Sequence, residues 1–297
     1  MSNIEKSTES LSKIVNVFRC PICQSSLRVV DLKSLICTNN HTFDFAKQGY
    51  VNMMTRPVTS HYDKKLFEAR QNMIVESGLY ALVHKKISEM INEYLVLSNV
   101  PAIMLDAGCG EGSHLQMTLD KCNIDAIKGI GLDVSKEGII MAAKKYKTPI
   151  WLVSDLASTP LADQSSHIIL NILSPANYME FKRILAPDGL VIKVVPRANY
   201  LKELREIIFS DENKKVYSND ETVSLFKRHF HLVKQSKLSY SKELNQAVLM
   251  NLIQMSPLTW NVKKEQLDVL INQGSSGITV DLDILVGVNE HVKRGAM

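Results

Sequence analysis

The stretch Leu105-Asp-Ala-Gly-Cys-Gly-Glu-Gly112 decides how this 297-residue sequence folds. It closes an apolar run, Ala102 to Asp106, that has the length and composition of a buried β-strand. Gly108, Gly110 and Gly112 then allow a sharp turn and a close approach to a ligand, with the amides of the next helix behind them. A strand that ends in such a turn is typical of the cofactor site of a Rossmann-like α/β domain.

Carboxylates around the turn indicate which cofactor it holds, because a G-x-G-x-G turn alone suits several. Asp106 and Glu111 would repel a pyrophosphate but suit the sulfonium and ammonium groups of S-adenosylmethionine (SAM). Asp133 ends the next apolar run, where a carboxylate can accept both ribose hydroxyls. Asp155 follows the third run and can accept from the adenine amino group. Each of these three aspartates has an alternative interpretation as a plain strand-end or helix-capping residue.

Two other side chains of this region are not expected to do chemistry. Cys109 lies in a crowded turn, so we expect a small packing residue and not a nucleophile. His114 follows the turn, and we expect it on the surface of the next helix.

A second motif lies nearer the N-terminus, where Cys20, Cys23, Cys37 and His41 fall at C-x2-C-x13-C-x3-H spacing. Two short-spaced pairs of thiolate and imidazole ligands supply the tetrahedron that Zn²⁺ prefers. Four protein ligands leave no open position, so the zinc site is expected to be structural. The other two cysteines, at positions 109 and 122, support no disulfide framework, which favours a reducing cytosol.

Beyond Pro101 the sequence alternates apolar runs, Gly or Asp turns and helical patterns, which predicts βαβ units and a parallel sheet. The predicted fold class is α/β: a class I Rossmann-like methyltransferase with a mostly parallel, doubly wound sheet and a small N-terminal zinc-binding module. We expect strands at 102–106, 127–133, 150–154, 167–173, 189–195, 231–240 and 278–285. We expect helices at 136–146, 199–209, 245–255 and 263–272.

Composition and charge limit the remaining possibilities. The chain is 45% hydrophobic with a formal net charge of +4, which suits one α/β domain plus a small appendage. Seven basic residues against three Asp give the segment 19–65 a charge of +4, which suits a phosphate-facing surface or, alternatively, a solvated face without a partner. The seven are Arg19, Arg28, Lys33, Lys47, Arg56, Lys64 and Lys65.

The N-terminus lacks a signal-peptide pattern, and no apolar stretch approaches ~18 residues. We therefore expect a soluble, cytoplasmic protein with no membrane partner. Four segments are predicted: a flexible lead-in at 1–17, a zinc-binding RNA-recognition module at 18–60, a helical connector at 61–99 and a SAM-dependent methyltransferase domain at 100–297. A zinc module joined to a SAM site points to methylation of a macromolecule, with RNA favoured.

A longer set of motifs narrows the substrate. The most specific stretch joins the zinc pattern to Phe43-Asp44 and Ala46-Lys-Gln-Gly-Tyr-Val-Asn52. Further matches are Asp63, Ala69-Arg70, Gly78, Tyr80, the glycine-rich turn, Gly131-Leu-Asp-Val-Ser135, Ser174-Pro175, Gln254-Met-Ser-Pro257 and Trp260. In these motifs the sequence resembles the bacterial 23S ribosomal RNA (guanine-N(1))-methyltransferases, a family that includes enzymes linked to macrolide resistance. The resemblance runs from Phe18 to the C-terminus.

The resemblance implies that SAM methylates N(1) of one guanine in a hairpin of 23S ribosomal RNA, that the zinc module takes part in RNA recognition, and that a homodimer forms a shared cleft. It also implies that Tyr80 contacts the cofactor, although the helical pattern around Tyr80 alone indicates a core residue. The chain departs from the family after the fifth strand. The family's Pro-x-x-x-His-Leu-x-Glu-Leu pattern is here Pro196 followed by Tyr200-Leu-Lys-Glu-Leu204, and tyrosine offers no imidazole or cationic contact.

Methyl transfer from a sulfonium is an in-line displacement, so we expect catalysis to come mainly from placement of the guanine. Its N(1) is protonated at neutral pH, so a base or a stabilised enolate-like oxygen must help, and no residue is assigned to that role. We expect the base to leave its stack for a pocket near residues 171–175, where Asn171 either binds the guanine edge or only ends a strand.

Two other functions stay open on the sequence alone. One is a SAM-dependent methyltransferase of a small molecule or protein, in which the zinc module is a structural cap. The other is a non-catalytic zinc-containing RNA-binding protein, which the departure at Tyr200 keeps open.

Overall fold

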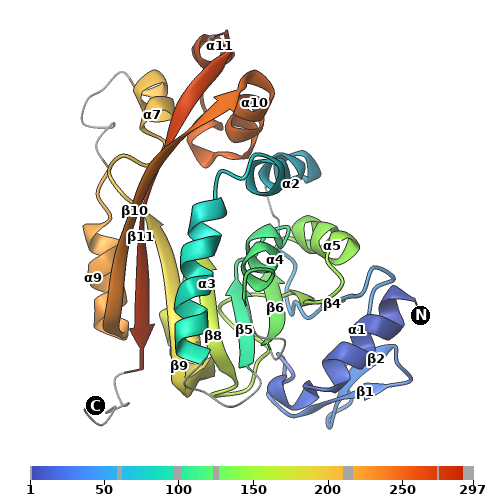
Figure 1. Cartoon of the computed structure of the whole chain (residues 1–297). Helices are drawn as coiled ribbons and strands as arrows, with labels where there is room; N and C mark the ends of the chain where they lie inside the picture. Colours follow the sequence, from blue (N-terminus) through green and yellow to red (C-terminus); the bar gives the residue numbers. More distant parts are fainter. Residues whose placement is uncertain are drawn as a thin grey trace.

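The computed structural model describes residues 2–58, 62–95, 102–122, 127–209, 217–272 and 274–289. A central sheet carries helices on both faces, and a small N-terminal module lies beside one of its edges (Figure 1). Within these ranges, no helix is both long enough and apolar enough to cross a membrane.

Eight strands form the central sheet in the order β10-β11-β9-β8-β5-β6-β7-β4. Neighbouring strands from β9 to β4 are parallel, whereas β11 pairs antiparallel with both β9 and β10. The bounds are β4 Tyr50–Asn52, β5 Ala102–Ala107, β6 Ile127–Asp133, β7 Ile150–Val153, β8 Ser166–Ile172, β9 Leu185–Pro196, β10 His231–Asn245 and β11 Ser275–Val288. The predicted α/β class with a mostly parallel sheet is confirmed, although β9, β10 and β11 are longer than expected.

Helices cover both faces, which explains why the parallel strands read as unbroken apolar runs. On one face lie α3 Ala81–Leu95, α4 Ser113–Leu119 and α5 Lys136–Lys145, and on the other lie α6 Tyr178–Ile184 and α9 Asp220–His229. The first set buries Val83, Ile87 and Ile139 in one apolar cluster. The second set buries Phe181 and Phe226 in another. The sequence analysis did not predict α6 or α9.

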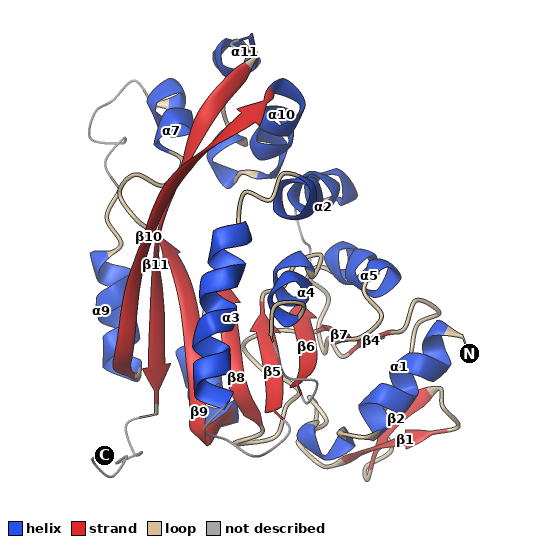
Figure 2. Ribbon diagram, viewed as in Figure 1, coloured by secondary structure: helices blue, strands red, loops and turns tan. Residues whose placement is uncertain are grey.

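A further group of helices stands at the edge where the parallel strands end (Figure 2). It comprises α2 Lys64–Gln71, the π-helix η2 Asn72–Glu76, α7 Lys202–Ile208, α10 Gln246–Met255, the 3-10 helix η3 Pro257–Thr259 and α11 Lys264–Asn272. Helix α2 packs against α10, which brings two segments far apart in sequence together beside the cofactor turn. The start of the predicted helical connector at His61, and its end beyond residue 95, lie outside the described residues.

The N-terminal module holds a three-stranded antiparallel sheet of β1 Leu27–Val30, β2 Ser34–Cys37 and β3 Thr42–Asp44. The following strand, β4, leaves this small sheet and pairs in parallel with β7. The module is therefore joined to the large domain by shared sheet hydrogen bonds as well as by the chain.

Residues 2–17, part of the segment that the sequence predicted as a flexible lead-in, contain α1 Asn3–Ser12 and the 3-10 helix η1 Val15–Val17. Helix α1 starts with a capping box: the Ser2 hydroxyl accepts from the Glu5 amide at 3.2 Å, and the Glu5 carboxylate accepts from the Ser2 amide at 2.8 Å. Leu11 is fully buried. The helix packs inward through Ile4, Thr8 and Leu11, which lie at helical spacing, but the segment is otherwise polar.

Candidate cofactor and zinc sites

The glycine-rich turn joins β5 to α4, and its three glycines all have positive φ, between 59° and 81°. A Cβ at Gly110 would lie 2.7 Å from Arg70 Nη1, and one at Gly112 would lie 2.3 Å from the Trp151 ring. Both the backbone conformation and the neighbouring side chains therefore require glycine here.

Two buried carboxylates lie at the turn. Asp106 is 1% exposed and Glu111 is fully buried, and one oxygen of each, Asp106 Oδ2 and Glu111 Oε1, has no hydrogen-bond partner among the residues that the structure describes. The other Glu111 oxygen pairs with Arg70 Nη1. Burial raises the pKa of Asp106 to about 7, against the opposing effect of Arg70. Unpartnered anionic oxygens in a buried turn fit a ligand that carries positive charge, as SAM does.

The two remaining aspartates differ in their surroundings. Asp133 ends β6 and accepts from the Gly110 and Ser135 amides, both at 2.8 Å, so its carboxylate is held against the turn. Burial raises the pKa of Asp133. Asp155 is exposed beyond β7 and accepts from the Ala157 amide at 2.8 Å. The structure therefore places Asp133 within the turn's hydrogen bonds and Asp155 at the solvent side of the same sheet edge.

Tyr80, just before α3, and Tyr200, just after β9, contact each other, with their hydroxyl oxygens 2.7 Å apart. Tyr80 is 1% exposed and packs edge-on against the ring of His114, at a centroid distance of 5.3 Å. The position where the chain departs from the family thus contacts the tyrosine that the resemblance assigns to the cofactor. His114 is buried and shares a 2.8 Å hydrogen bond with His84, so its predicted place on the helix surface is wrong.

Arg70 also lies at this site, although no sequence pattern predicted a role for it and it appeared only among the residues that carry the family resemblance. Helix α2 presents it, and Asp63 caps that helix by accepting from the Leu66 amide at 2.8 Å. Besides Glu111, Arg70 reaches the Cys109 carbonyl at 3.4 Å. Cys109 itself is buried and burial raises the pKa of its thiol, in agreement with a packing role.

Asn171 has a structural role, although binding of the guanine edge was one of its two predicted roles. Its amide nitrogen donates to the Ala107 carbonyl at 3.0 Å, to Ser174 Oγ at 2.6 Å and to the Pro175 carbonyl at 2.8 Å. Its oxygen accepts from the ammonium of Lys193, which also reaches the Ser174 carbonyl at 3.3 Å. Burial lowers the pKa of Lys193 to about 8. This network fixes the loop after β8, next to the cofactor turn.

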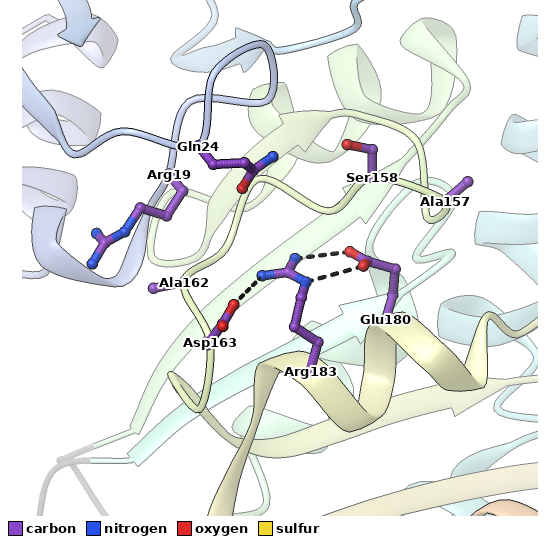
Figure 3. Close-up of a pocket in the computed structure, with 8 residues that line it drawn as sticks. All are labelled: Arg19, Gln24, Ala157, Ser158, Ala162, Asp163, Glu180 and Arg183. Carbon is purple, nitrogen blue, oxygen red and sulfur yellow. Dashed lines mark hydrogen bonds and ion pairs between the residues drawn. The ribbon is translucent and has the colours of Figure 1, made fainter. Parts of the chain in front are cut away.

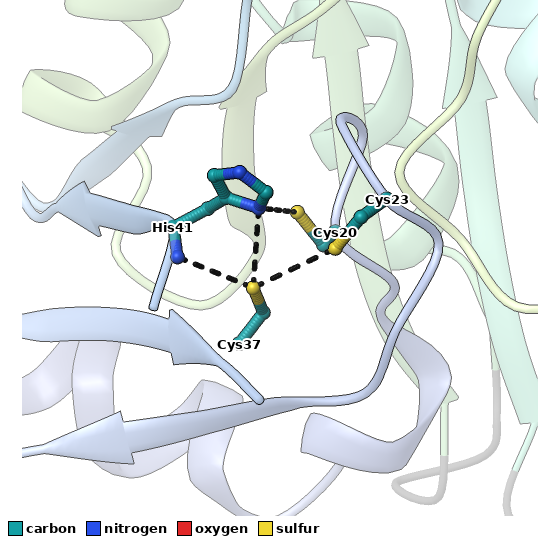
Figure 4. Close-up of side chains that lie close together, drawn as sticks. All are labelled: Cys20, Cys23, Cys37 and His41. Atoms are coloured by element: carbon teal, nitrogen blue, oxygen red, sulfur yellow. Dashed lines mark hydrogen bonds between the residues drawn. The ribbon is translucent and has the colours of Figure 1, made fainter. Parts of the chain in front are cut away.

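The four metal-spaced residues come together in the N-terminal module (Figure 4), with their ligand atoms all within 4.8 Å of one another. The sulfurs of Cys23 and Cys37 are 3.7 Å apart, and His41 Nδ1 lies 3.5 Å from Cys20 Sγ and 3.4 Å from Cys37 Sγ. A zinc tetrahedron with ordinary bond lengths has sulfur–sulfur edges of about 3.8 Å and sulfur–nitrogen edges of about 3.6 Å. The cluster therefore fits Zn²⁺ with all four positions taken by protein.

A cavity of about 560 Å³ lies where the module meets the large domain (Figure 3). Arg183 spans its wall and pairs with Asp163 at 2.8 Å and with Glu180 at 2.8 Å. None of the cofactor-turn residues lines this cavity, and the charge of Arg183 is already neutralised by its two partners. We therefore do not assign it as the cofactor site. Its other lining residues are Arg19, Gln24, Ala157, Ser158 and Ala162.

The basic residues predicted to face phosphate are mostly on the surface. Six of the seven are exposed and Arg19 is partly buried. Lys64 pairs with Glu68 at 2.9 Å, an exposed contact that contributes little to stability. Most of the positive charge of the segment 19–65 is thus open to a polyanion.

The parallel sheet, the glycine turn with its buried carboxylates and the Cys₃His cluster define a class I SAM-dependent methyltransferase with a structural zinc site. Two family models match the chain: the zinc-ribbon model "RlmA, N-terminal" over residues 18–62 and the model "Methyltransferase domain" over residues 105–192. The zinc ligands, the glycine-rich turn, Asp133 and Asp155 thus lie within matched segments, whereas Arg70, Tyr80 and Tyr200 lie outside them.

Two similar proteins align with nearly the whole chain. YxjB of Bacillus subtilis (strain 168), a provisionally named 23S rRNA (guanine-N(1)-)-methyltransferase, is 42% identical, with 92% of this chain and 97% of YxjB aligned. The 23S rRNA (guanine(748)-N(1))-methyltransferase of Streptomyces fradiae is 30% identical over 86% of this chain and 89% of that protein. The chain belongs to the 23S rRNA (guanine-N(1))-methyltransferase family.

Proposed function

We propose that this enzyme transfers the methyl group of SAM to N(1) of one guanine in a hairpin of 23S ribosomal RNA. The similarity to YxjB along nearly the full length of both chains carries the choice of substrate. The unpartnered, buried oxygens of Asp106 and Glu111 support a cationic methyl donor independently of that similarity.

The cofactor residues are assigned by chemistry. Asp106 and Glu111 face the positive groups of the donor, Asp133 accepts from the ribose hydroxyls, and Asp155 accepts from the adenine amino group. Tyr80, oriented by its hydroxyl contact, packs against the cofactor. When bound, SAM supplies an electrophilic methyl carbon.

The zinc module serves the RNA. Cys20, Cys23, Cys37 and His41 hold Zn²⁺, which fixes the turns that carry the neighbouring basic side chains. Binding of such charges to phosphates releases counterions from the RNA, so the affinity falls as the salt concentration rises. The sequence of the RNA is expected to be read from unpaired bases, since the deep groove of an RNA helix hides base edges.

Catalysis rests on placement of the guanine ring beside the donor. The loop after β8 is rigid because Asn171 and Lys193 tie it to the end of β5 and to β9. This fixed loop limits the orientations that the guanine ring can adopt, and the ammonium of Lys193 puts a positive charge beside the loop. That charge favours the electron-rich oxygen that develops as N(1) loses its proton.

The test is methylation of unmodified 23S ribosomal RNA with labelled SAM, followed by mapping of new stops to reverse transcription, since a methyl at N(1) blocks pairing. We expect one strong stop at a hairpin guanine. Asp133→Ala should abolish it, whereas Asp163→Ala, which removes an exposed aspartate before the start of β8, should not. Labelling of protein or small molecules in place of RNA would refute the proposal.

A further inference from the structure

Two aromatic side chains stay exposed beside the helices that flank the cofactor turn. Trp260 is 47% exposed and Tyr62 is 41% exposed. Their ring centroids lie 5.6 Å apart at an interplanar angle of 66°. Tyr62 precedes α2 and Trp260 follows η3, so the packing of α2 on α10 brings the two rings together.

A third ring connects this pair to the site of reaction. Phe67 lies 6.1 Å from Tyr62, centroid to centroid, and is itself buried. A Cβ placed on Gly110 would lie 3.4 Å from Phe67 Cε1. The row Trp260, Tyr62, Phe67 therefore runs from the surface to the cofactor turn.

Charge near the exposed end of the row suits a nucleic acid. Lys65 and Lys263 are exposed within three residues of Tyr62 and Trp260, and Arg56 is exposed on the chain that leads to α2. Lys64 is exposed as well, although Glu68 partly neutralises it. Aromatic faces flanked by cations bind unpaired bases, because the rings stack on the bases while the cations attract the phosphates.

We infer that Tyr62 and Trp260 form a stacking platform for unpaired bases of the RNA next to the target guanine. This inference rests on the proposed function and names the part of the RNA that the surface recognises: single-stranded loop nucleotides, not the paired stem. The platform holds a neighbouring base while the target base lies at the turn.

Fluorescence can observe the platform directly, because the chain has two tryptophans and the other, Trp151, is 2% exposed. The emission that wild-type protein shows and Trp260→Phe lacks belongs to Trp260. We expect a 23S hairpin to quench that emission, and a fully paired duplex of equal length to leave it unchanged. Equal quenching by the duplex, or hairpin binding without quenching, would overturn the inference.

Binding affinity supplies the second measurement. Trp260→Ala should weaken hairpin binding about 5- to 150-fold, the range for loss of one stacked base, while Trp260→Phe retains most of it. Val233→Ala, a truncation at a similarly exposed position on β10, should have no effect. Calorimetry with SAM should give the same affinity for all three variants, which shows that they are folded.

The outcomes separate the two proposals. If wild-type protein methylates the hairpin guanine and Trp260→Ala binds the hairpin as tightly as wild type, the platform is wrong and the proposed function stands. If wild-type protein binds no RNA but captures an aromatic-rich protein surface through Trp260, both are wrong.

Discussion

The zinc cluster and the cofactor turn are both built at tight turns, but they depend on the fold in opposite ways. The turn extends from β5, a strand that is buried along its whole length in the central sheet. The zinc ligands belong to a module with strands of three or four residues, whose buried side chains, such as Leu27, Leu35 and Phe43, pack in one cluster with side chains of the large domain. The folded large domain holds the cofactor turn in place, whereas we expect bound zinc to hold the turns of the module in place.

Removal of the metal should therefore have the largest effect of any single change. Structural zinc contributes on the order of 10–16 kcal/mol of apparent binding free energy, and a Cys37→Ser variant loses most of it. We expect amides of β1 to β3 to lose protection from hydrogen exchange and RNA binding to be lost, while calorimetry still detects SAM. Cys122→Ser is the matched control, because Cys122 lies outside the cluster. Loss of SAM binding in Cys37→Ser alone would show that the two sites are not separable.

Deletion of residues 1–54 would be a poorer form of that experiment. It removes β4, which pairs with β7 at the edge of the central sheet. It also removes the chain around Val17 and Arg19, whose backbone bonds to Ala162 and Pro160 anchor the module. A deleted protein could thus fail through the sheet, whereas metal removal acts on the module.

The cofactor turn should instead be sensitive to added volume. Gly112→Ala places a methyl group 2.3 Å from the Trp151 ring and forces φ of 81° on alanine. Overpacking of this kind costs about 1–3 kcal/mol, and the left-handed backbone adds about 1–2 kcal/mol. Gly274→Ala is the control, because its φ of 75° is similar and, apart from its chain neighbours, no atom of the described residues lies within 4 Å of its added Cβ.

Denaturant unfolding should show the smaller, backbone cost alone for Gly274→Ala, and only Gly112→Ala should lose SAM binding. Equal loss of stability in the two variants would mean that the Trp151 contact does not constrain the turn.

The same contrast explains what the sequence predicted. The turn, the aspartates at strand ends and the zinc spacing are local patterns, and each was found from neighbouring residues. Arg70 and Tyr200 enter the cofactor site through tertiary packing, Arg70 by its pair with Glu111 and Tyr200 by its contact with Tyr80. No periodicity predicts such contacts, and here only the family resemblance marked either position.

The expectation for His114 failed for a related reason. A lone histidine after a turn is usually solvated, but His84 from α3 supplies its hydrogen bond inside the core. The predicted segment boundaries remain predictions, although β4 shows that sheet pairing crosses the boundary between the module and the domain.

Affinity for SAM should depend on pH through Asp106. With a pKa of about 7, its ionised fraction rises from about one tenth at pH 6 to about nine tenths at pH 8. Since the anion attracts the cationic cofactor, we expect affinity to rise about tenfold over this interval, as measured by calorimetry. Asp106→Asn should bind weakly at both pH values with no such rise.

Stability of the protein without cofactor should change with the opposite sign. A carboxyl whose folded pKa lies above its ordinary value of 3.8 binds more protons in the folded state than in the unfolded state. Its ionisation therefore lowers the free energy of unfolding as pH rises, and this destabilisation is complete above about pH 7. The stability of Asp106→Asn relative to wild type should therefore increase from pH 4 to pH 8. A constant difference would contradict the raised pKa.

The smallest expected effect concerns Tyr200. Tyr200→Phe removes the hydroxyl that meets Tyr80 and leaves the ring packing in place. A net hydrogen bond contributes about 0.5–1.5 kcal/mol, so we expect SAM to bind about 2- to 10-fold more weakly. Tyr94→Phe is the matched control, because its hydroxyl donates to the Asp188 carbonyl at the end of α3 remote from Tyr80, so it should leave SAM affinity unchanged. If Tyr200→Phe also binds SAM like wild type, the packing of Tyr80 in the core is enough to position it, and the tyrosine at the family's histidine position has no part in holding the cofactor.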